Sequence, residues 1–103
     1  MDDEEKLIEH RLSVVRDYLQ NRISHCRVLD GASAPQERTL VVTFGTPGRR
    51  TVRVSTALLS NPRLDSLQLA EGLEQNDVAR KVLATPGFYL DAQAVKARRR
   101  GDT

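Results

Sequence analysis

Residues 39–55 have the sequence TLVVTFGTPGRRTVRVS, and this stretch decides the expected fold. Two runs rich in β-branched residues flank a turn-forming segment, Gly45-Thr46-Pro47-Gly48. β-branched residues favour strands, and short glycine-containing loops join antiparallel strands, so we predict a β-hairpin from Thr39–Phe44 and Arg50–Ser55. Alternation along the two strands predicts an inner apolar face made of Leu40, Val42, Phe44, Val52 and Val54.

The other face of this hairpin is predicted to be mainly polar and to carry no aromatic side chain. It would display Thr39, Val41, Thr43, Thr51 and Arg53, joined by Arg27 from the preceding strand. A sheet with one apolar and one polar face is covered by helices on one side only.

Upstream of the hairpin we expect one further strand and one long helix. The strand spans His25 to Leu29 and ends at Asp30-Gly31, followed by a loop over 32–36. The helix spans 4–23, where apolar residues recur at helical spacing and acidic residues at its start favour the helix dipole.

The apolar arc of this helix spans roughly 180°, well above the minimum of about 100° for one-sided packing. Two arginines fall inside it. So wide a face predicts contact with two neighbours, such as a sheet and either another helix or a second subunit. The residues expected at a protein interface are Leu7, Arg11, Val14, Tyr18 and Arg22. In the alternative interpretation, the two arginines lay their stems over the edge of the core and reach solvent.

Helical patterns return after the hairpin. Thr56 to Ser60 predicts one helical turn, and Asn61-Pro62 predicts the N-cap and first residue of a longer helix. The apolar side of that helix would be Leu64, Leu67, Ala70 and Leu73, and Asn76 or Asp77 would begin another helix with Val78, Val82 and Leu83.

The C-terminal part leaves two alternatives open. Phe88-Tyr89-Leu90 is either a small edge strand or an apolar plug. Asp91 is placed to cap a last helix over Ala92 to Arg100, which ends in basic residues as the helix dipole prefers.

These elements predict an α+β fold, with a three-stranded antiparallel sheet and helices packed on one face. The predicted order is α-β-β-β-α-α, with a short C-terminal helix left open. A chain of 103 residues fits one domain, expected over 1–95, followed by a basic, flexible tail over 96–103.

Composition excludes several classes of protein. No stretch approaches the about 20 consecutive apolar residues of a membrane-spanning helix, and the formal net charge is only +2. Cys26 is the one cysteine, so an internal disulfide is excluded, and the acidic N-terminus has no apolar secretory signal. We therefore expect a cytoplasmic protein of bacterial type, without a membrane partner.

The sequence offers no catalytic group, metal site or cofactor site. His25 and Cys26 are adjacent, and neighbours on a strand point to opposite faces, so they cannot form a nucleophile and base. Cys26 is predicted to be a small core residue and His10 to be exposed. The two histidines and one cysteine do not have the short spacing typical of zinc ligands, so we predict no zinc site. We predict that the protein is not an enzyme.

The leading hypothesis is a non-enzymatic protein-interaction module, with a protein partner that includes a second copy of this chain as a homodimer. The alternative is a nucleic-acid-binding module, because arginine favours contacts with phosphate. The residues expected at such an anion or nucleic-acid contact are Arg27, Arg38, Arg49, Arg50, Arg53, Arg98, Arg99 and Arg100.

Overall fold

The predicted hairpin forms the centre of the sheet. The computed structural model describes residues 3–45 and 48–96, and in it β2 (Glu37–Phe44) pairs antiparallel with β3 (Arg49–Ser55). Leu40 lies opposite Val52, and both side chains are fully buried. The hairpin and its inner apolar face are therefore confirmed, while Thr46-Pro47 of the predicted turn lies outside the described residues.

The strand before the hairpin is longer than predicted. β1 (Cys26–Ala34) pairs antiparallel with β2 as far as Ala34 opposite Glu37, with a shift in register between Asp30 and Ser33. The predicted end at Asp30-Gly31 is wrong because the glycine lies in a β-bulge of a continuing strand. A Cβ on Gly31 would approach side-chain atoms of Thr39 to 3.2 Å, so the close packing there favours glycine.

The outer edge of β1 is partly closed by the long helix α1 (Asp3–Arg22). The Val28 backbone N–H donates to the side-chain oxygen of Gln20 at 3.2 Å. An unpaired edge N–H is a point where another strand can add, and covering it is a common protection of sheet edges.

A fourth strand corrects the prediction of a three-stranded antiparallel sheet. β4 (Phe88–Leu90) pairs parallel with β3, so the sheet is mixed and has the order β1-β2-β3-β4. Of the two alternatives for this segment, the edge strand is correct. Three residues are too few for a strand pattern to be recognised, and a parallel partner needs a long crossover, which three helices supply.

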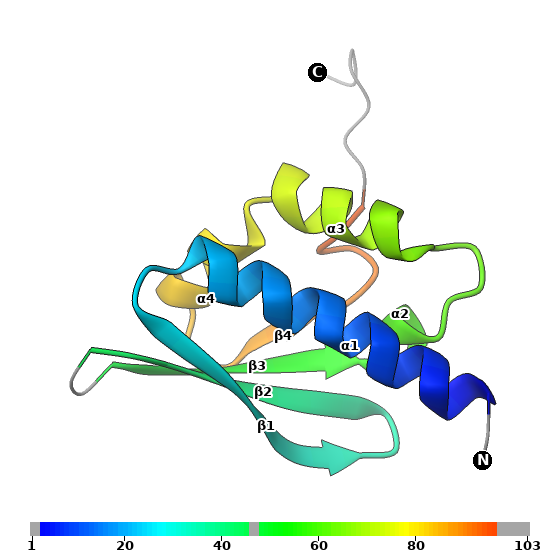
Figure 1. The fold of residues 1–103 in the computed structure, drawn as a ribbon, viewed down its shortest axis with the longest axis horizontal. Helices are drawn as coiled ribbons and strands as arrows, with labels where there is room; N and C mark the ends of the chain where they lie inside the picture. The colour runs from blue at the N-terminus through cyan, green and yellow to red at the C-terminus, as the bar shows by residue number, and fades with distance from the viewer. Residues whose placement is uncertain (1–2, 46–47, 97–103) are drawn as a thin grey trace.

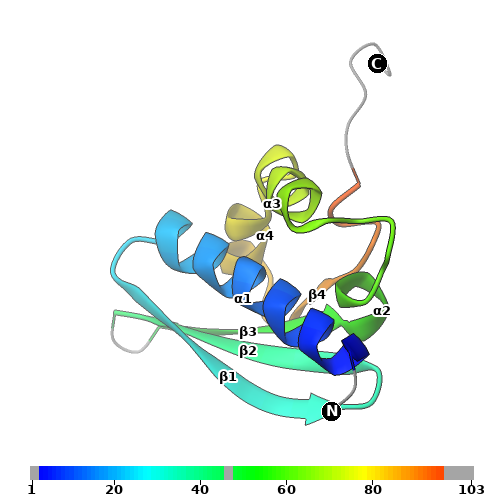
Figure 2. The same ribbon diagram turned by 45° about the vertical axis from the view of Figure 1, so that its right-hand side comes forward.

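Those three crossover helices lie on the same side of the sheet as α1 (Figures 1 and 2). They are α2 (Thr56–Leu59), α3 (Ser66–Gln75) and α4 (Val78–Ala84). The core lies between the two layers, where leucines and valines of the helices meet those of the strands. Its fully buried members include Val15, Leu19, Leu40, Val42, Val52, Val54, Leu69, Leu73, Val78, Val82 and Leu90. The α+β class, with helices on one face, is confirmed. The predicted order α-β-β-β-α-α is wrong, because a third helix after the hairpin and a closing strand make it α-β-β-β-α-α-α-β.

The wide apolar arc of α1 is explained by two neighbours within the chain. Ile8, Leu12 and Leu19 are buried in the core, while Val14 and Tyr18 pack against its margin. Helix α1 lies beside α3 above the sheet (Figure 2), so a sheet and another helix share its apolar surface.

Helix α3 begins four residues later than the predicted helix. Asp65 accepts a hydrogen bond from the Gln68 backbone N–H at 2.7 Å, and the Gln68 side chain accepts one from Asp65 N–H at 3.0 Å. This capping box satisfies two free N–H groups, so it prevails over Asn61-Pro62 as the start of the helix. The shift also changes the buried side, which consists of Leu69, Gly72 and Leu73 and leaves Leu67 exposed.

The segment after β4 packs on α3 instead of forming a helix. Asp91 accepts hydrogen bonds from the backbone N–H groups of Gln93 and Ala94, but the described part of the predicted helix, 92–96, is a turn. The buried Asn76 amide holds this turn, since its Nδ2 donates to the Gly72 carbonyl at 2.8 Å and the Lys96 carbonyl at 3.0 Å. The predicted last helix is therefore wrong over 92–96, and 97–100 lies outside the described residues.

Candidate functional site

The predicted interface residues on α1 make several contacts within the chain. Arg22 forms a two-point ion pair with Glu74 of α3, and the Tyr18 hydroxyl accepts a hydrogen bond from the Ala79 N–H of α4. Arg11 is buried, and its Nη1 donates to the Asn61 carbonyl at 3.2 Å. Leu7 and Val14 are half-buried.

A hollow of about 320 Å³ lies between α1 and α3, and three of the predicted interface residues, Val14, Tyr18 and Arg22, line it. Its apolar lining comes from Val14, Tyr18 and Ala70, and its polar lining is Asp17, Asn21, Arg22 and Glu74. Leu67, one turn before Ala70 on α3, is 69% exposed. We call Leu67 and this hollow the α1–α3 surface. The sequence pattern missed Leu67 as a surface residue because it assigned Leu67 to the buried side of its helix.

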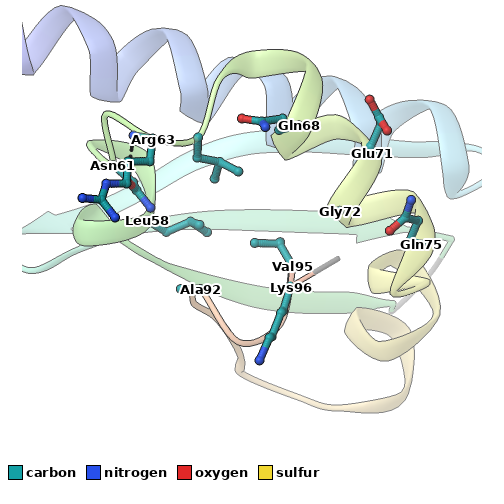
Figure 3. Close-up of a pocket in the computed structure, with 11 residues that line it drawn as sticks. Leu58, Asn61, Arg63, Gln68, Glu71, Gly72, Gln75, Ala92, Val95 and Lys96 are labelled. Carbon is teal, nitrogen blue, oxygen red and sulfur yellow. Dashed lines mark hydrogen bonds between the residues drawn. The ribbon is translucent and has the colours of Figure 1, made fainter. Parts of the chain in front are cut away.

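A second hollow of about 340 Å³ lies between α2, α3 and the 92–96 turn (Figure 3). Leu58, Leu64 and Val95 give it an apolar floor, and polar side chains stand around its rim. Glu71 and Lys96 point in different directions in Figure 3, so the polar groups do not converge on one point. The described residues that line this hollow are therefore not arranged as a set of catalytic groups.

The remaining reactive side chains are also separated. Cys26 is half-buried at the start of β1, and burial raises the pKa of its thiol, which a backbone hydrogen bond only partly opposes. His25 is exposed in the preceding turn and His10 is exposed on α1. Among residues 3–45 and 48–96, no three His, Cys, Asp or Glu side chains are grouped so that they could hold a metal ion.

The structure splits the predicted arginine cluster between the two faces of the sheet. Arg38 lies on the helix side, where it pairs with Glu5 at 2.7 Å and Glu9 at 2.8 Å, and the hydrogen bond that it donates to the Glu5 carboxylate raises the pKa of Arg38. Arg50 donates from Nε to the Leu83 carbonyl at 3.0 Å, so it too is tied to the helical layer. Arg98, Arg99 and Arg100 lie outside the described residues.

The other three arginines share the face of the sheet that no described element covers. Arg27 on β1 lies opposite Thr43, which lies opposite Arg49 on β3, and all three form one row across the strands. A parallel row holds Thr39, Arg53 and Tyr89. Between the two rows lie Leu29, Val41 and Thr51, with Leu29 51% exposed.

Tyr89 corrects the expectation that this face has no aromatic side chain. It is 42% exposed, and the Arg53 guanidinium lies 5.3 Å from the centre of its ring. The alternation in Phe88-Tyr89-Leu90 places Tyr89 on the opposite face from its two buried or half-buried neighbours. That alternation was visible in the sequence. It assigns Tyr89 to the uncovered face only when β4 is known to pair with β3 in the sheet.

No family model, no curated protein and no solved structure matches this chain. Within the described part of the chain, no helix is both long enough and apolar enough to cross a membrane. The functional argument therefore depends on the two exposed regions, the α1–α3 surface and the open face of the sheet.

Proposed function

We propose that this protein is a non-enzymatic, cytoplasmic interaction module that self-associates through the α1–α3 surface. The observation that carries this proposal is the 69% exposure of Leu67, which stands one helical turn before Ala70, a residue that lines the apolar hollow. A large apolar side chain in water next to a concave apolar site is typical of protein interfaces.

The charges around the hollow favour a second copy of this chain as the occupant. The rim carries both signs, with Asp17 and Glu74 acidic and Arg22 basic. In a two-fold symmetric dimer each patch meets its own copy, so a rim of mixed sign can pair with itself. Leu67 of each copy would then enter the hollow lined by Val14, Tyr18 and Ala70 of the other.

The oligomeric state of the full chain tests this proposal. Sedimentation velocity and light scattering over a range of concentrations should show a monomer–dimer equilibrium for the wild type. Leu67→Ser should shift it to monomer. At about 2 kcal/mol for each buried leucine, a symmetric dimer loses about 4 kcal/mol, or about a thousandfold in the dissociation constant.

Leu29→Ser is the matched control. Leu29 is also an exposed leucine, at 51%, but it lies on the open face of the sheet. The proposal requires that this variant dimerises like the wild type. A wild type that is monomeric up to its solubility limit, or a dimer that Leu29→Ser disrupts and Leu67→Ser does not, overturns it.

A further inference from the structure

We propose that the open face of the sheet binds single-stranded nucleic acid through Arg27, Arg49, Arg53 and Tyr89. These four residues, called the open-face site below, come from strands β1, β3 and β4. The helices cover one face of the sheet (Figure 1), and the strand register with its alternation places these four residues on the other face. This proposal therefore does not depend on self-association through the α1–α3 surface.

Charge complementarity is the first argument for a polyanion. The three arginines are exposed, and among the described residues the ion pairs of these arginines are limited to Arg53 with Glu37, at 4.0 Å. Arg27 and Arg49 belong to one row and Arg53 to another, four residues further along the strands. At about 3.3 Å per residue the rows lie about 13 Å apart, so the cations can follow an extended backbone across the sheet.

The pairing of Tyr89 with Arg53 favours bases over the carboxylates of an acidic peptide. The guanidinium and the phenol ring lie 5.3 Å apart and both remain accessible. Planar guanidinium groups and aromatic rings are the surfaces on which unpaired bases stack. Thr39 and Thr51 lie on the same face, Thr39 in the row of Arg53 and Thr51 in the row between the arginines, and their hydroxyls can hydrogen-bond to phosphates or base edges.

The shape of the site favours a single strand over a duplex. A sheet face offers no described helix or ribbon that could enter a groove, and bases inside a duplex are not available for stacking on Tyr89. A single strand can place its bases over Tyr89 and the apolar row of Leu29 and Val41 while its phosphates meet the arginines.

The test is fluorescence anisotropy of labelled oligo-dT and oligo-U with the full chain, repeated from 50 to 200 mM salt. Three neutralised phosphates give a slope of log K against log salt of about −2 for single strands, or about 20-fold weaker binding over that range. Arg27→Gln/Arg49→Gln/Arg53→Gln should remove this slope relative to the wild type. The comparison isolates the open-face site from basic residues elsewhere in the chain.

Two single variants separate stacking from charge. Tyr89→Leu should weaken binding about tenfold without changing the salt slope, because stacking is worth about 1–3 kcal/mol per base. Arg80→Gln is the control for charge, since Arg80 is highly exposed on α4, in the helical layer, and its loss should leave binding unchanged. Thermal melts verify that each variant is folded.

Four results overturn the proposal: no binding at 50 mM salt, tighter binding of a duplex of the same length, a loss in Arg80→Gln equal to that in the single variant Arg49→Gln, made for this comparison, or preferential binding of a polyglutamate peptide. The last result would assign the face to an acidic protein segment. Absence of nucleic-acid binding does not contradict the proposed dimer, and a monomeric wild type does not contradict nucleic-acid binding. The two proposals are therefore tested separately.

Discussion

The hydroxyl of Tyr18 in α1 accepts a hydrogen bond from the backbone N–H of Ala79 in α4 at 3.0 Å. The first N–H groups of a helix have no partner within it, and side chains usually supply one. Asp77 occupies the N-cap position of α4 but makes no capping side-chain hydrogen bond, and its φ is 50°. A tyrosine 61 residues earlier in the chain therefore performs part of the capping.

Tyr18→Phe should destabilise the protein by about 1 kcal/mol, since it leaves a partly buried N–H without its acceptor. For a domain of this size that corresponds to a melting temperature lower by about 4–8 °C. Urea unfolding of both proteins gives the difference. Tyr89→Phe is the matched control, because Tyr89 is 42% exposed, and should stay within about 0.5 kcal/mol of the wild type. Equal stability of Tyr18→Phe and wild type contradicts the capping role.

Gly72→Ala should destabilise the protein and loosen the 92–96 turn. A Cβ at this position would lie 2.3 Å from the Val95 carbonyl oxygen, so the turn has to move away. Overpacking costs about 1–3 kcal/mol and the higher helix propensity of alanine returns up to about 1 kcal/mol, which leaves a net loss. Hydrogen exchange should show faster exchange at Ala94 and Lys96. Glu71→Ala, at the neighbouring exposed position, should leave these amides protected.

Arg11→Met should leave stability unchanged or raise it by about 1–2 kcal/mol. Arg11 is 6% exposed, its Nε is buried without a hydrogen-bond partner, and Nη1 donates to one carbonyl. Replacing a poorly compensated buried cation by an apolar side chain of similar length is often stabilising. Arg11→Ala, which removes the packing of the stem as well, should cost about 2 kcal/mol. A large loss in Arg11→Met as well would mean that the charge itself stabilises the fold.

The Cys26 thiol should make folding stability fall at alkaline pH. Burial raises the pKa of the thiol above its ordinary value, so the unfolded chain ionises at a lower pH than the folded one. Stability from this group is complete below the unfolded pKa and is lost as the pH rises through the folded pKa. Urea unfolding from pH 7 to 10 should therefore show a smaller decline for Cys26→Ala than for the wild type. Parallel curves for the two proteins would contradict the shift.

The sequence was most informative where the decisive interactions are local. The hairpin over 39–55 depends on alternation and a short turn, and both are visible within 17 consecutive residues. The outward orientation of Arg27 and Arg53 followed from the same alternation. The start of α3 was also present locally, as Asp65 and Gln68 at capping-box spacing, but Asn61-Pro62 offered a competing start that only the folded loop excludes.

The errors concern contacts between distant segments. Strand β4 has three residues, and its pairing with β3 joins Val54 to Leu90. The residues near Tyr89 do not indicate which strand β4 will pair with, so the face of the sheet that Tyr89 occupies could not be predicted from them. For the same reason, the exposure of Leu67 depends on which side of α3 packs against α1. The residue pattern of one helix does not identify the elements that pack against it.

The parallel pairing of β3 with β4 also has a consequence for the order of folding. The β1–β2–β3 meander joins strands that are close in the chain. Strand β4 can pair with β3 only after the segment between Ser55 and Phe88 has become compact. Contacts of long sequence separation close slowly because the loop entropy is lost before they form. The meander can therefore assemble before the segment that follows Ser55 has folded. Tyr89 then comes to lie beside Arg53 only when β4 pairs with β3.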